Sequence, residues 1–171
     1  LWRFDLEGNS PSSWKTGFGN SPLMTPSVSR PVSTAPLFVT HPKGGLMVMY
    51  ATGRLYSDSD EVNTDLQSIY GVWDLTPVGK TSLSSNVASP GQLVEHAVNP
   101  TATSTNPTLG YTIVPASAEV TYSNAAGIRG WSINQRLAAG ERSIFDPFIL
   151  SSFAVFNTTA PSNSSAGDPC M

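Results

Sequence analysis

The sequence has few charged residues, little cysteine and no long apolar run, and each shortage excludes a class of protein. Only 12% of the residues are charged, and 9 Lys and Arg against 12 Asp and Glu give a net charge of -3. Without a basic stripe, nucleic acid is not an expected partner. No run approaches the roughly 18 apolar residues of a transmembrane helix, so we expect no membrane span. Two His and one Cys are too few for a zinc-type ligand cluster.

Small polar residues, glycine and proline are abundant instead. The 14 Gly and 14 Pro are spread along the 171 residues, so no amphipathic helical window survives between them. Residues 136–141 are the best helix candidate, at one turn. This composition indicates a single extracellular all-β domain with long loops. The chain does not begin with Met and Leu1 already lies in a strand pattern, so we expect a piece of a longer protein.

Two apolar segments flank a polar, acidic loop and define the predicted sheet. Residues 46–52 form a nearly continuous apolar run bounded by glycines, which is typical of a strand buried on both faces. Residues 68–75 alternate, so one face carries Ile69, Gly71, Trp73 and Leu75 and the other carries Tyr70, Val72 and Asp74. With a strand at 37–40 and a turn at 41–45, we predict a three-stranded antiparallel meander.

Further strands are predicted at both ends of the chain. Residues 1–6 alternate, which predicts that Trp2, Phe4 and Leu6 face the core. Residues 76–115 are rich in Ser, Thr, Pro and Asn, with a short strand or helical turn at 92–98. We read them as an insertion that lies over one face or packs as its own hairpin. Later strands are expected at 111–114, 119–122, 130–134, 143–150 and 152–158, with a bend at Asp146–Pro147.

The loop between the two central strands is the densest group of possible metal ligands. It contains Asp58, Asp60, Glu61, Asn63 and Asp65. Its spacing departs from an EF-hand, because Val62 stands at the fifth position and no Gly follows. We therefore favour a solvated loop tip capped by Asx turns over a calcium site. There is no Gly-x-Ser-x-Gly elbow and no phosphate-binding loop, so we assign no catalytic, cofactor-binding or metal-ligating residue.

Several separated segments carry a family resemblance. They are Met-Tyr-Ala-Thr-Gly-Arg at 49–54, Gln-Ser-Ile-Tyr-Gly-Val-Trp-Asp at 67–74, Leu-Trp-Arg-Phe-Asp-Leu at 1–6, Gly-Ile-Arg-Gly-Trp-Ser-Ile at 127–133, Gly-Glu-Arg at 140–142, Asp-Pro at 146–147, Phe-Ala-Val-Phe-Asn-Thr-Thr at 153–159 and Asp-Pro-Cys at 168–170. In this order they resemble the C-terminal propeller of the PilY/PilC family of type IV pilus biogenesis and adhesion proteins. The resemblance covers about half the residues and omits the insertion.

The resemblance implies a fold and a role. The fold is all-β: antiparallel blades of a partial, C-terminal β-propeller with long loop insertions, in one domain over residues 1–171. Within it, 1–75 hold the first strands and a blade, 76–115 the Ser/Thr/Pro-rich insertion, 116–160 the last blades and 161–171 a polar tail. The implied role is non-enzymatic: pilus assembly and surface attachment at an extracellular pilus tip or bacterial cell surface. Its implied partners are minor pilins or the remainder of the propeller, and a host or abiotic surface ligand.

The resemblance also bears on calcium and on Cys170. The family's calcium loop precedes the strand resembling residues 1–6, so it implies calcium in the parent protein and no ligands here. Cys170 has no internal partner; both a cysteine in a following strand and an exposed thiol fit the sequence.

Three alternatives remain. The first is a carbohydrate-binding module that stacks sugars on Trp14 or Tyr111, the second a quinone-dependent propeller enzyme, and the third a self-contained β-sandwich. A propeller piece with cut blades would expose sheet edges and need a complementary chain, which separates it from the sandwich.

Overall fold

The computed structural model describes the chain except residues 28, 100–111, 115–119, 124–126, 136–137 and 162–171. In this part of the chain the fold is mostly β, and of the pairings between strands only β6 with β8 is parallel. The antiparallel, all-β expectation is confirmed at this level. Cys170 and Tyr111 lie outside the described residues.

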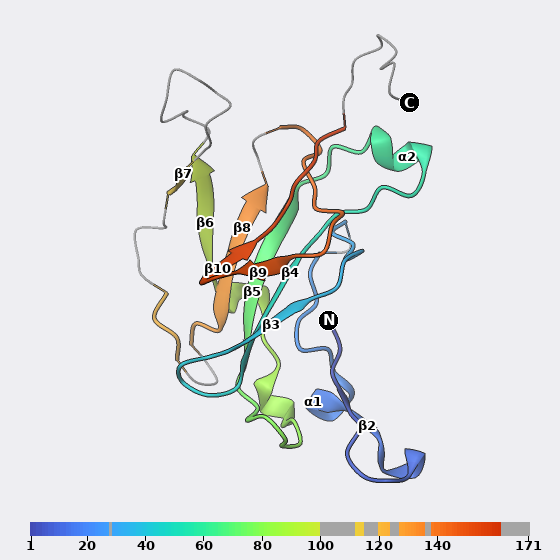
Figure 1. Cartoon of the computed structure of the whole chain (residues 1–171), viewed down its shortest axis with the longest axis vertical. Coiled ribbons are helices and arrows are strands. Elements are labelled where there is room, and N and C mark those ends of the chain that lie inside the picture. The colour runs from blue at the N-terminus through green and yellow to red at the C-terminus, as the bar shows by residue number, and fades with distance from the viewer. Residues whose placement is uncertain (28, 100–111, 115–119, 124–126, 136–137, 162–171) are drawn as a thin grey trace.

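A six-stranded sheet organises the molecule (Figure 1). Its spatial order is β3-β4-β5-β8-β6-β7. The strands are β3 (Leu37–Thr40), β4 (Leu46–Ala51), β5 (Gln67–Asp74), β8 (Gly130–Gln135), β6 (Leu93–Asn99) and β7 (Thr112–Val114). The first four are antiparallel neighbours in chain order, interrupted only by the segment that contributes β6 and β7. The predicted meander is therefore confirmed, with a fourth strand added by β8.

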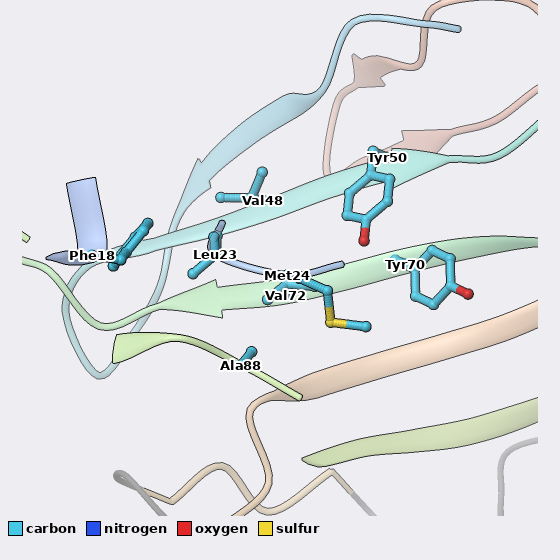
Figure 2. Packing of buried hydrophobic residues seen from close by; sticks show 8 residues of the cluster. All are labelled: Phe18, Leu23, Met24, Val48, Tyr50, Tyr70, Val72 and Ala88. Atoms are coloured by element: carbon cyan, nitrogen blue, oxygen red, sulfur yellow. The ribbon is translucent and has the colours of Figure 1, made fainter. Parts of the chain in front are cut away.

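The central strand β4 is buried on both faces because two apolar clusters cover the sheet. On one face Val48, Tyr50, Tyr70 and Val72 form a buried cluster. Figure 2 shows Phe18, Leu23, Met24 and Ala88 packing onto them from segments outside the sheet. On the other face, Met47, Met49 and Trp73 form the second buried cluster. The predicted division of residues 68–75 between two faces is confirmed.

The hairpin between β3 and β4 is held by its turn. Gly44 and Gly45 have φ values of 87° and 74°, the left-handed region that glycine adopts without strain. The Trp73 indole Nε1 donates to the Gly44 carbonyl over 2.7 Å. The predicted turn at residues 41–45 is confirmed, and an aromatic of the core fixes its position.

The segment after β5 first packs onto one face of the sheet through Ala88 and then joins the sheet itself. It contains short 3-10 turns at Ser84–Asn86 and Pro90–Gln92, and then β6, whose residues 93–97 pair in parallel with residues 130–134 of β8. β6 pairs antiparallel with β7. The strand expected at 92–98 is present, and its parallel pairing was not predicted.

Two short ribbons of two strands each do not pair with the strands of the six-stranded sheet. One is formed by β1 (Phe4–Asp5) and β2 (Lys15–Thr16), with a 3-10 turn at Pro11–Ser13 between them and the single turn α1 (Gly17–Asn20) after β2. The other is formed by β9 (Phe148–Leu150) and β10 (Phe153–Val155). The strand predicted at 143–150 is shorter because it begins only after the Asp146–Pro147 interruption. Residues 138–140, at the end of the helix candidate, form a bend and turn, and Tyr122 makes only an isolated bridge.

Candidate interaction surfaces and a polar cavity

The N-terminal segment turns the charged side chains of Arg3 and Asp5 inward, against the prediction. Arg3 pairs with Asp5 and with Asp74, each over 2.9 Å, and both carboxylates are buried. The second Asp74 oxygen accepts from the Thr76 amide, and the fully buried Arg129 donates to the Trp73 carbonyl. Because buried charges require partners, this network fixes which face of residues 1–6 is inside. The assignment of Trp2, Phe4 and Leu6 to the core was therefore wrong.

The apolar side chains of that ribbon are exposed instead. Trp2, Phe4 and Leu6 have exposed fractions of 53%, 63% and 60%, and Phe38 on the edge strand β3 has 56%. Trp2, Phe4 and Phe38 also line a hollow of about 370 Å³. We call Trp2, Phe4, Leu6 and Phe38 the N-terminal apolar surface. Large apolar side chains gathered at one hollow are characteristic of an interaction site.

A second apolar surface lies on the β9–β10 hairpin. Its members are aromatic or aliphatic, are between 45% and 71% exposed, and occupy both strands and the approach to them: Phe145, Phe148, Ile149, Leu150 and Phe153. We call them the C-terminal apolar surface. Among the strands that the structure describes, β9 and β10 pair only with each other, so this hairpin also leaves backbone groups open for pairing.

The acidic loop folds into one helical turn, α2 (Asp58–Glu61), where a solvated tip was expected. Ser57 and Asp60 form a capping box, which satisfies backbone amides at the start of the turn. The Asp60 carboxylate is buried and pairs with Arg54 over 2.7 Å. That hydrogen bond, followed by one from the Tyr56 amide, lowers the pKa of Asp60 to about 2. The Asp60 oxygens are thus occupied by protein donors.

The rest of the acidic loop contains an exposed part and an Asx turn, as expected of a solvated tip. The Asp65 amide donates to Asn63 Oδ1 over 2.7 Å, which is an Asx turn. Asp58 and Glu61 are exposed. Among the described residues, no group of three or more His, Cys, Asp and Glu side chains is placed to hold a metal ion.

Arg142 anchors the acidic loop that contains α2 through hydrogen bonds to its backbone. Its buried guanidinium donates to the carbonyl oxygens of Gly140, Arg54, Asp60 and Asn63. One side chain therefore ties α2 and its flanks to the segment after β8. This role was missed from sequence, because a single Arg after a Gly-Glu pair gives no signal of which carbonyls it will meet.

Between Arg142 and the loop lies a polar cavity of about 150 Å³. All but one of its lining residues are polar: Ser29, Pro31, Arg54, Asp60, Asn63, Asp65, Gln67 and Arg142. Gln67 is 5% exposed, and its Nε2 donates to the carbonyls of Ser29 and Asp65. Its Oε1 is buried and accepts no hydrogen bond within the described part of the chain. This oxygen has almost no accessible surface, so it is an unsatisfied acceptor buried beside the cavity and not a part of its wall.

The two histidines do not meet in a catalytic arrangement. His41 stacks on Trp73 at 4.3 Å between ring centroids and meets the edge of Tyr122 at 4.5 Å. Burial, then the nearby Lys43, lowers the pKa of His41. His96 lies on β6 opposite Ile133. His41 therefore serves as an aromatic packing residue at the turn.

No family model matches the sequence. Comparison with curated proteins gives clear relatives. Over 94% of its length the chain is 25% identical to the type IV pilus biogenesis factor PilY1 homolog of Xylella fastidiosa, and over 99% it is 27% identical to the type IV pilus biogenesis factor PilY1 of Pseudomonas aeruginosa. The chain is homologous to the C-terminal region of PilY1. This confirms the resemblance found in the separated sequence segments.

The fold agrees with that of PilY1. The crystal structure of the Pseudomonas aeruginosa PilY1 C-terminal domain superposes with a TM-score of 0.74, at 24% identity, over 94% of this chain and 39% of that one. The chain spans only 11% and 17% of the two PilY1 relatives. The homology therefore covers nearly all of this chain and a small part of those proteins.

Two further features of the chain bear on the remaining expectations. No helix among the described residues is long and apolar enough to cross a membrane. Trp14, a proposed sugar-stacking residue, is 50% exposed and lines a separate hollow with Asp5 and Lys15. Its proposed companion Tyr111 lies in a part of the chain that the structure leaves undescribed.

Proposed function

We propose that this chain is the closing part of a β-propeller in a type IV pilus protein, and that its role is structural and adhesive. The homology to pilus biogenesis factors, which extends over nearly the whole chain, carries this proposal. This homology supports a location at the cell surface or on the pilus and a role in pilus assembly and surface attachment. The proposed role includes no catalytic step. A calcium site of the parent protein lies outside this chain.

The sheet supports the propeller. A propeller blade is a four-stranded antiparallel sheet of chain neighbours. β3, β4, β5 and β8 have this arrangement, with β6 and β7 added beyond the fourth strand. We propose that β1–β2 and β9–β10 belong to the neighbouring blades, which are incomplete here.

The two apolar surfaces support the choice of partner. They expose large side chains at ribbons with only two strands each, and a two-stranded ribbon is marginally stable alone. The remainder of the propeller is the occupant that would both pair the open strands and cover the apolar side chains. Minor pilins are the proposed partners of the completed propeller, and a host or abiotic surface is its proposed ligand.

Deletion from the parent gene tests this function. A strain that lacks the segment coding for these residues should lose surface pili and attachment, while the rest of the parent protein is still made. Immunogold labelling of the intact strain should place the protein at pilus tips. Normal piliation and attachment without the segment would overturn the proposal, and labelling along the whole fibre would overturn the tip location.

A further inference from the structure

We propose that the hollow beside Trp14 binds an acidic saccharide unit, a sugar that carries a carboxylate. The hollow has a volume of about 500 Å³, and Trp14, Lys15, Gly19, Asn20 and Thr81 are among the residues that line it. Its lining includes parts of β2 and α1, which lie at the same end of the molecule (Figure 1). The proposal gives a chemical class to the surface ligand of the adhesive role proposed above, and in this respect it rests on that role.

Trp14 offers an aromatic surface to a sugar ring. Its side chain is 50% exposed. Within the described part of the chain it packs on no other aromatic ring, and its indole Nε1 donates to no protein acceptor. An exposed indole can stack on the C–H face of a sugar while Nε1 donates to a hydroxyl. Trp14 is therefore free to contact a ligand in both ways.

The core holds the neighbouring part of the hollow in one conformation. Phe18, Gly19 and Asn20 have φ values of 52°, 63° and 63°, three consecutive residues in the left-handed region. This region is rare for a bulky residue, and Phe18 is kept there because its side chain is fully buried and its amide donates to Ser82 Oγ over 2.8 Å. Strained backbone of this kind gathers at ligand sites, where it pre-organises the binding groups.

The acidic group of the hollow is already occupied. Asp5 Oδ1 accepts from Arg3, and Asp5 Oδ2 accepts from both the amide and the hydroxyl of Ser82. Asp5 is also buried, with 9% of its surface exposed. A cationic ligand would therefore find no open carboxylate at this hollow among the described residues.

The polar side chains that remain free point to an anionic partner. Lys15 is exposed, and its ammonium group forms no ion pair within the part of the chain that the structure describes. Asn20 and Thr81 are exposed as well, and their side chains bond to none of the described residues. A hydrogen bond between an ammonium group and a carboxylate is stronger than one between neutral groups. Lys15 therefore favours an acidic sugar over a neutral one, while the amide and the hydroxyl suit the sugar's own hydroxyls.

Titration with small glycosides tests the proposal. The whole parent protein is studied by saturation-transfer NMR with the methyl glycosides of N-acetylneuraminate, glucuronate and galacturonate. Methyl galactoside and methyl glucoside are the neutral controls, and acetate is a carboxylate without a sugar ring. At least one acidic glycoside should bind saturably and about tenfold more tightly than the controls, which corresponds to one charge-assisted hydrogen bond. Preference for the sialate indicates an animal glycan as the source, and preference for a uronate indicates a uronate polysaccharide.

Variants locate the binding. Trp14→Ala should weaken binding of every glycoside about tenfold, because the stacking surface is lost. Lys15→Met should weaken only the acidic glycosides, down to the level of the neutral ones. Tyr56→Ala and Lys43→Met are matched controls at exposed positions outside the hollow and should leave binding unchanged. Trp14 and Lys15 are themselves exposed, so both variants should fold.

Three outcomes would overturn the proposal. They are no saturable binding by any acidic glycoside, binding of acetate or the neutral glycosides as tight as that of the acidic ones, and unchanged binding in both hollow variants. The deletion strain described above tests the adhesive role separately. Loss of attachment in that strain without glycoside binding would overturn the saccharide site alone, whereas glycoside binding with normal attachment would overturn the adhesive role alone.

Discussion

At the scale of single residues, burial of charge decides which way the chain faces. The alternation of residues 1–6 correctly indicates a two-faced strand, but hydrophobicity alone chooses the wrong inner face. The reason lies elsewhere in the sequence: Asp74 and Arg129 are buried, and Arg3 joins their network. No local pattern reports a partner more than 70 residues away, so this reversal could not have been predicted from the segment itself.

Arg142 is predicted to be the residue on which the α2 loop depends most. Arg142→Met should lower the free energy of unfolding by about 3 kcal/mol, because it leaves several buried carbonyls without a donor. Urea unfolding at neutral pH measures the change. Lys15→Met, at an exposed position, is the matched control and should change it little. Equal stability of the two variants would refute the loop-holding role.

The packing of the Trp131 ring across the sheet is predicted to require glycine at position 71. A Cβ at Gly71 would lie 2.3 Å from Cε2 of Trp131, and real contacts are not that short. Gly71→Val should therefore destabilise the chain by about 2 kcal/mol through overpacking. Gly91→Ala is the control, because nothing lies within 4 Å of the added Cβ. Thermal melts followed by near-ultraviolet circular dichroism report both stability and the environment of Trp131; a Gly71 variant as stable as the control would contradict this packing.

Asp60 is predicted to make the chain sensitive to acid. Its pKa is lowered from 3.8 to about 2 in the folded chain, chiefly by the Arg54 side chain. A lowered pKa means that this contribution to stability is present above pH 4 and is lost as the pH falls toward 2. Urea midpoints measured from pH 5 to pH 2 should fall less steeply for Asp60→Asn than for the original chain. Parallel curves would show that the Asp60 carboxylate does not titrate as described.

At the scale of elements, the sequence predicts best where periodicity and burial agree. The strands at 37–40, 46–52 and 68–75 and the turn at 41–45 follow from local pattern, and the structure has them within a residue or so. The parallel pairing of β6 with β8 does not follow, since long-range pairing is not encoded in a short segment. The helical turn α2 was also missed, because its capping box lies in a loop without apolar periodicity.

The C-terminal apolar surface is predicted to act in association and not in folding. Leu150→Asp and Phe153→Asp change side chains that are 61% and 71% exposed, so the stability of the isolated chain should change by no more than about 0.5 kcal/mol. Both should reduce self-association of the isolated chain and weaken its binding to the upstream region. Val78→Asp, at a 71% exposed position outside both surfaces, is the control. Pull-down with the upstream region measures binding, and undiminished binding by both variants would exclude this surface.

At the scale of the whole molecule, the central sheet has a covered core, while the two apolar surfaces are exposed. Both faces of β4 and β5 are covered, whereas the N-terminal and C-terminal apolar surfaces are not. The family resemblance predicts uncovered apolar surfaces of this kind, because it implies that other blades complete the propeller. The sequence did not indicate the polar cavity, whose walls come from residues 29 to 142 and meet only in the folded chain.

We propose above all that another part of the parent protein completes this chain. The most direct measurement is the mass of the chain in solution by light scattering after size exclusion, alone and with the upstream region. The chain alone should associate or aggregate, and a single monodisperse species should form when the upstream region is present. A monodisperse monomer of 18.1 kDa with one cooperative melt, unchanged by the upstream region, would contradict it and favour a self-contained sandwich.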